Sequence, residues 1–229
     1  MAIDMELEAV LRPHQYEMAP YPPKMITLAN GKVMVVRQAQ REDVPGILKS
    51  VHPCLFIERD YYDIVSARLY GELLAWYRYR VKSEYCLMGQ VDGFLVGIVN
   101  GRLENEKVGM SYHTLAIDRG LRIGSHLFAA KMEYHMEYLN QEEVLIVAES
   151  PIGFRRWMIE YPLEKTTIPH ELGGGDSYLL TRDIYFKAKP RLVVGDRPVP
   201  QHLMDEAMED IKFADDDTIR ERIAGLKGR

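Results

Sequence analysis

The sequence predicts an α/β (α+β) protein with a mixed, mostly antiparallel sheet of six to seven strands and helices on both faces. Two hairpins are indicated by Asn30-Gly31 and Asp92-Gly93, because such dipeptides form tight turns between β-rich segments. The second hairpin continues, after a polar break at 104–107, into a third antiparallel strand. Val144 to Val147 is a short apolar run that follows a helix, so it should pair in parallel with the strand preceding that helix.

The composition is that of a globular protein with one domain and appendages. Its 229 residues are 47% hydrophobic and 28% charged, which is enough apolar material to bury a sizeable core. A net charge of −5 argues against a general nucleic-acid binder, which normally carries a basic excess. The two cysteines, Cys54 and Cys86, lie in apolar surroundings outside any CxxC pair, so buried thiols are expected rather than a disulfide or a zinc site.

The chain divides into an N-terminal appendage (1–23), a central domain (24–188), and a linker with a C-terminal helical extension (189–229). The appendage contains a short predicted helix, Asp4–Leu11, followed by three prolines that break regular structure. The N-terminus has neither the basic region nor the apolar stretch of a signal peptide. No run approaches 18 apolar residues, so no membrane partner is expected and a cytoplasmic location is predicted.

The first half of the domain is predicted as a hairpin over 24–37, two helices and a three-stranded meander. Glu42 and Asp43 favour the first turn of the first helix, because carboxylates suit a helix N-terminus. The second helix covers 60–79, and four of its apolar residues are spaced for one buried side: Ile64, Leu69, Leu73 and Trp76. The meander strands are expected at 85–91, 94–103 and 108–117.

The second half begins with a long helix, Ile123 to Leu139, which has two apolar faces and should therefore pack against the sheet and against other elements. One face carries Phe128, Met132, Met136 and Leu139, and the other carries Leu127, Tyr134 and Tyr138. After the strand at 144–147, the pattern predicts a helix over 152–160 and strands near 165–168 and 177–184.

The C-terminal extension is predicted as a linker over 190–200 and two short helices. Their apolar stripes are Leu203, Ala207 and Ile211 in the first helix, and Ile219, Ile223 and Leu226 in the second. Asp215 to Asp217 are suited to cap the second helix. The stripes should be buried either on the domain or on a second copy, so a homodimer is one of two alternatives.

A glycine-containing loop, Arg119-Gly120-Leu121-Arg122-Ile123-Gly124-Ser125, joins the third meander strand to the long helix. Its glycines allow the backbone to approach a ligand closely. The free N–H groups at the start of the helix carry the positive end of its dipole, which favours phosphate binding. The loop is not a Walker loop and does not follow the first strand of a βαβ unit, and the alternative is a tight turn.

The order of elements and this loop together resemble the GNAT superfamily of N-acetyltransferases. The loop of that family reads roughly Arg/Gln-x-x-Gly-x-Gly/Ala, and the segment from Arg119 to Phe128 is similar to it at most positions. Met34 to Arg37 and Arg41 to Val44 also resemble the opening strand and helix of the family. The resemblance covers about residues 32–186.

The resemblance implies acetyl-CoA as cosubstrate and an amine as acceptor. The loop N–H groups would hold the pyrophosphate, and the end of the preceding strand would pair with the pantetheine arm. The thioester would enter a gap between the strands at 108–117 and 144–148. The implied cofactor-binding residues are Leu115, Ala116, Ile117, Arg119, Gly120, Leu121, Arg122, Ile123, Gly124 and Ser125.

Two departures from the family pattern concern the loop and the general acid. Arg122 stands where the family has its middle glycine. The tyrosine that protonates the leaving thiolate in the family is not at its expected place, where this sequence has Trp157. Ser150 and Tyr161 are the candidate replacements.

Two residues are candidates for the base that removes the proton of the acceptor amine. Glu149 lies at the end of a predicted core strand, and its alternative is a solvated or helix-capping carboxylate. His113 lies on the strand before the loop, where a neutral imidazole suits proton transfer near pH 7; its alternative is a hydrogen-bonded sheet histidine. His170 and Glu171 are third candidates, and no HExxH or comparable metal pattern occurs.

The sequence therefore favours acetyl transfer from acetyl-CoA to an amine, on a small molecule or a protein. A non-catalytic acyl-CoA-binding or regulatory module is the alternative favoured by the missing tyrosine. A structural or interaction protein is the third, based on the terminal extensions.

Overall fold

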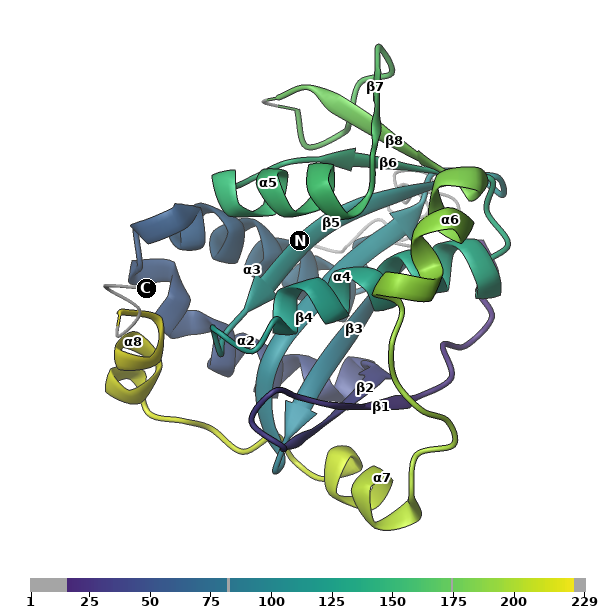
Figure 1. The fold of residues 1–229 in the computed structure, drawn as a ribbon. Coiled ribbons are helices and arrows are strands. Elements are labelled where there is room, and N and C mark those ends of the chain that lie inside the picture. Colours follow the sequence, from purple (N-terminus) through teal and green to yellow (C-terminus); the bar gives the residue numbers. More distant parts are fainter. Residues whose placement is uncertain (1–15, 82, 174, 225–229) are drawn as a thin grey trace, which may run out of the picture.

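A computed structural model of the protein describes residues 16–81, 83–173 and 175–224, and it contains one eight-stranded sheet with the order β1-β2-β3-β4-β5-β6-β8-β7 (Figure 1). The strands are β1 (Lys24–Thr27), β2 (Val33–Gln38), β3 (Glu84–Val91), β4 (Phe94–Leu103), β5 (Val108–Ala116), β6 (Glu143–Val147), β7 (Glu164–Thr166) and β8 (Ser177–Thr181). The predicted fold class is confirmed. The sheet has eight strands, slightly more than the six to seven predicted, and its two edge strands, β1 and β7, are short.

Strand directions follow from the turns and from the crossover helix. Asp92 and Gly93 form a two-residue turn with φ of 52° and 79°, the left-handed geometry that matches the twist of a hairpin. All neighbouring strands are antiparallel except β5 and β6, which are parallel, as the helix between them predicts. The parallel pairing runs only from Val108 and Glu143 to Ser111 and Ile146.

Helices α2 (Val44–Val51) and α3 (Tyr62–Tyr77) cover the far side of the sheet in Figure 1. Leu69, Leu73 and Trp76 are buried in their shared core, as predicted. Ile64 was expected on the same side but is 45% exposed. Val65 occupies that face instead, because it lies four residues before Leu69 on the helix.

Helix α4 (Ile123–Glu133) covers the near side and continues as a π-helical turn, Tyr134–Tyr138. Its two apolar faces pack as expected: Leu127 and Tyr134 against one core cluster, and Phe128, Met132 and Met136 against another. Leu139 packs with the first cluster, not the second as predicted. A π-helical turn holds more residues than an α-helical one, so it rotates the residues that follow onto another face.

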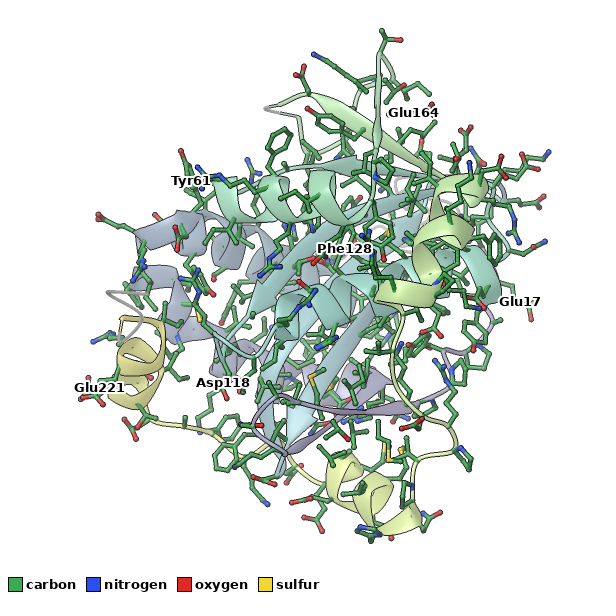
Figure 2. All side chains as sticks on the ribbon, in the orientation of Figure 1. Glu17, Tyr61, Asp118, Phe128, Glu164 and Glu221 are labelled. Atoms are coloured by element: carbon green, nitrogen blue, oxygen red, sulfur yellow. The ribbon has the colours of Figure 1, made fainter. Side chains whose placement is uncertain are left out.

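Helix α5 (Pro151–Glu160) lies over the second of these clusters, and Figure 2 shows Phe128 between α4 and α5. Helix α6 (Arg182–Leu192) was not predicted and replaces the end of the strand expected to reach residue 184. Thr181 ends β8 because its hydroxyl caps α6, accepting a hydrogen bond from the Ile184 N–H at 3.4 Å. Helix α6 runs across residue 188, the expected end of the central domain.

The C-terminal extension packs on the domain through α7 (Gln201–Met208) and α8 (Asp216–Ala224). Ile211, Ile219 and Ile223 belong to the core cluster beneath α2 and α3. Asp215 caps α8, accepting from the Thr218 N–H at 2.8 Å. The predicted helix Asp4–Leu11 and the apolar residue Leu226 lie outside the described residues. No helix in the described part of the chain has the length and apolar character needed to span a membrane.

Candidate active site

A cavity of about 270 Å³ opens between the end of β5 and the residues that follow β6. The start of α3 and the N-terminal half of α5 form its sides, and the loop before α4 forms its floor. Of the predicted cofactor-binding residues, eight line this cavity: Leu115, Ala116, Arg119, Gly120, Arg122, Ile123, Gly124 and Ser125. The other two face the cores, since Ile117 is buried beneath α3 and Leu121 packs beside α4.

The loop reaches α4 through two residues in left-handed conformation. Gly120 has φ of +89°, and Arg122, the residue before the helix, has φ of 60° and ψ of 20°. The Arg122 side chain does not cap the helix; it pairs with Glu160 on α5, with Nη2 2.9 Å from Oε1. The N–H groups of the first turn of α4 are therefore not satisfied by this side chain, and that turn borders the cavity.

Gly124 lies where the wall of the cavity allows a small residue. A Cβ at this position would lie 3.7 Å from Ala116 Cβ and 3.9 Å from Thr114 Cγ2, which are ordinary contacts. The position therefore accepts glycine or alanine, and branched side chains would extend from it beside the first turn of α4.

Arg119 and Tyr62 connect the end of β5 to the start of α3. The Arg119 guanidinium pairs with Asp60 at 2.8 Å and lies over the Tyr62 ring. The Tyr62 hydroxyl donates to the Ala116 carbonyl at 2.7 Å. Because the Ile117 N–H bonds to β4, the polar backbone groups of Ala116 point away from β4, toward the cavity side.

A β-bulge marks the point where β5 leaves β6. Tyr112 and His113 together oppose the single residue Asn100 on β4, immediately after Ser111, the last β5 residue paired with β6. The Asn100 side chain bridges the bulge by accepting from the His113 N–H at 3.0 Å. Beyond the bulge, Thr114 lines the cavity.

The structure brings the two candidate bases together. Glu149 lines the cavity, and its Oε2 lies 2.6 Å from His113 Nδ1, although Glu149 follows β6 and His113 lies on β5. Arg68 donates to the other oxygen of Glu149 at 3.0 Å. On the far side of the imidazole, Nε2 lies 3.0 Å from Glu72 Oε1, at an angle that is poor for a hydrogen bond.

The ionisation of this pair follows from its contacts. Burial alone would lower the pKa of His113, but the flanking Glu149 and Glu72 outweigh it and raise that pKa above its ordinary value. Burial alone would raise the pKa of Glu149, but the contacts with His113 and Arg68 outweigh it and lower that pKa. The pair therefore holds a proton on the imidazole across the acidic range and a negative charge on the carboxylate.

The remaining candidates lie elsewhere. Tyr161 is buried among Phe128 and its neighbours, outside the cavity lining, and its hydroxyl has no partner within the described residues. Ser150 lines the cavity and caps α5 by accepting from the Gly153 N–H at 3.1 Å. His170 is buried against the Ser111 carbonyl, and Glu171 pairs with Arg102, both away from this cavity.

Two charged residues near the pair were missed by the sequence analysis. Glu72 extends from α3 to His113 and to Asn100, which donates to it at 2.8 Å. Lys131 is fully buried beneath the bulge. A signal for Lys131 was present, because it lies four residues after Leu127 and is thus a charge on an apolar face of the helix.

Comparisons with known proteins agree with this architecture at the level of structure. No protein-family model matches the sequence, and no curated protein matches it significantly. An uncharacterized protein from Bacillus halodurans is similar in structure, with a TM-score of 0.53, 11% identity, and coverage of 74% of this chain and 95% of that one. The GNAT domain of S. lividans PAT is similar with a TM-score of 0.51, 12% identity, and coverage of 69% and 96%.

At such low identities these likenesses establish the fold and nothing about the substrate. In this chain, the end of β5 and the start of α4 border the cavity. The chain has the GNAT fold, as its loop motif and order of elements predict.

Proposed function

We propose that the protein transfers an acyl group, in the first instance acetyl, from a CoA thioester to an amine. One observation carries the proposal. Glu149, which contacts His113, lines the same cavity as the glycine-containing loop over 119–125. The binding site for an anionic group and the proton acceptor therefore lie at one cavity. Acyl transfer from CoA to an amine requires both.

The residues at the cavity fit CoA in three respects. The first turn of α4 presents backbone N–H groups to it without a capping side chain from Arg122. Gly124 leaves room for close approach of a ligand. The polar backbone of Ala116 faces the cavity side, where an extended pantetheine arm would bind beside the strand. Bound there, CoA would supply the activated acyl group.

Glu149 and His113 would accept the proton that the amine loses. An ammonium group entering the cavity would meet the Glu149 carboxylate. Once the pH exceeds the raised pKa of His113, the pair has lost its shared proton and can take one from the amine. The two residues therefore act as one acceptor, with the carboxylate at the cavity and the imidazole behind it.

A second candidate is a non-catalytic acyl-CoA-binding module, and the position of Tyr161 favours it. This residue lies in the core, and Trp157, which stands where the sequence resemblance implies the family's tyrosine, is stacked on Phe128 at 4.8 Å and lines the cavity. Under the first proposal, the Ser150 hydroxyl is the remaining donor, because its oxygen accepts from Gly153 while its proton stays free.

The two candidates differ in turnover. We expect CoA at about 100 times its dissociation constant to stabilise the folded protein by roughly 2.7 kcal/mol in thermal unfolding. Acetyl-CoA should then release free thiol with a panel of primary amines, polyamines and lysine peptides. Glu149→Gln should bind CoA but lose at least about tenfold in kcat, and the exposed Glu142→Gln is the matched control.

Each outcome decides between the proposals. Binding of CoA without turnover on the whole panel supports the non-catalytic module. Absence of a thermal shift at millimolar CoA, in protein shown to be folded, contradicts both candidates.

A further inference from the structure

Lys131 is a buried lysine whose ammonium contacts backbone oxygens and not a carboxylate. Its side chain is 0% exposed, and within the described residues no carboxylate lies at ion-pair distance from Nζ. Nζ instead lies near three backbone carbonyl oxygens, at 3.4 Å from Asn100, 3.2 Å from Tyr112 and 3.1 Å from His113. A fourth contact, at 3.3 Å, is the Thr114 hydroxyl.

All four contacts lie at or directly beside the bulge where β5 parts from β6. Asn100 is the β4 residue at the bulge, and Tyr112 and His113 are the two β5 residues opposite it. Thr114 is the next residue along and lines the cavity. One ammonium group therefore binds both strands at the position where the cavity begins.

This arrangement is costly for folding. Removing an ammonium from water is unfavourable, and burial lowers the pKa of Lys131 to about 7, although the nearby carboxylates of Glu149 and Glu72 oppose part of this effect. The neighbouring helix residues Phe128 and Met132 are apolar, so a methionine would fill the same space without that cost. Retention of a charge against stability is typical of functional sites.

We propose that Lys131 is a positioning residue for the reaction centre: its ammonium fixes the bulge through the Asn100, Tyr112 and His113 carbonyls. The fixed bulge holds the His113 imidazole against Glu149 and places Thr114 in the cavity wall. The consequence for catalysis rests on the proposed acyl transfer, whereas the consequence for His113 does not.

The test is Lys131→Met in the full chain, with Met132→Leu as a control that changes packing on the same helix. Thermal unfolding reports stability, calorimetry reports CoA affinity, and an NMR titration reports the pKa of His113. Amine acetylation gives kcat and KM. These four readouts separate positioning from packing.

Lys131→Met should unfold at the parental temperature or above it and bind CoA within about twofold of the parent, because the loop is two helical turns away. Its kcat should fall at least about tenfold, since small displacements of reacting groups are costly. The pKa of His113 should fall toward its ordinary value of about 6.5 as the contact with Glu149 loosens. Mere loss of a nearby positive charge would move that pKa upward.

A Lys131→Met protein with parental kcat and an unchanged or raised His113 pKa would overturn the proposal. If the parent binds CoA but acetylates no amine, the proposed function fails, and the His113 titration alone decides the positioning role. Should Lys131→Met not fold, Lys131→Leu applies the same test. If neither variant folds, the proposal is also refuted. The proposal requires that the buried charge of Lys131 lowers stability, so an apolar replacement should still fold.

Discussion

Substitution of Gly97 tests whether the position of α4 against the sheet controls CoA binding at the cavity. A Cβ at this β4 position would lie 2.7 Å from Leu127 Cδ1 and 2.8 Å from Ile123 Cγ2, and 3.1 Å from the Leu115 carbonyl oxygen. Carbon atoms normally approach to about 3.5–4.0 Å, so in Gly97→Ala the start of α4 must move away from the sheet. Overpacking of this kind costs about 1–3 kcal/mol.

The expected result is a lower melting temperature together with weaker CoA binding. For a protein of this size, 1 kcal/mol corresponds to about 2–4 °C, so Gly97→Ala should melt a few degrees to about 10 °C lower. CoA affinity should fall because Ile123 begins the helix and lines the cavity. Calorimetric titration and thermal unfolding measure the two effects.

Gly124→Ala is the matched control, since it adds the same methyl group on the first turn of α4 itself, where the methyl group makes only ordinary contacts. Its contacts of 3.7 Å and 3.9 Å are ordinary, and alanine is a better helix former than glycine by up to about 1 kcal/mol. It should keep CoA affinity and melt at the parental temperature or slightly higher. If Gly97→Ala keeps the melting temperature and the CoA affinity of the parent, the position of α4 against the sheet does not control CoA binding at the cavity.

Three further predictions concern the acid, the base and the tail. Tyr161→Phe should leave kcat unchanged and raise the free energy of unfolding by about 1 kcal/mol, because it removes a buried hydroxyl without a partner; a loss of kcat would make Tyr161 the acid. The value of kcat/KM should rise with pH through the raised pKa of His113, since the deprotonated pair is the acceptor; a flat profile between pH 6 and 9 would contradict this. Ile219→Ala should cost about 2–5 kcal/mol in denaturant unfolding, because Ile219 is buried in the main core, and a parental midpoint would show that the tail is dispensable.

Local signals made most of the fold predictable. The turn at Asp92-Gly93 and the apolar faces of α4 depend on near neighbours, so they could be read from the sequence. Helix α6 could not, because Ser177–Thr181 and the residues after it continue a strand-like pattern while the Thr181 cap redirects the chain. Leu139 was misplaced because nothing local indicates a π-helical turn.

The site was less predictable than the fold, for a geometric reason. Glu149 and His113 could each be named, but their contact depends on the register between β5 and β6. That register is set by tertiary packing, so the sequence could not show that the two residues are hydrogen-bonded to each other. Glu72 carried no signal, since a glutamate on a helix is ordinarily solvated.

Helix α4 contacts three different parts of the molecule: the cavity, the bulge between β4 and β5, and residues near both ends of the described chain. Its first turn borders the cavity, and Lys131 holds the bulge. Two residues further, the buried Glu133 accepts from Tyr21 in the N-terminal appendage, from Lys24 in β1 and from Arg197 in the C-terminal extension. A rigid helix transmits a displacement at one end to the other, so the segments outside the predicted central domain help to fix the position of the cavity floor.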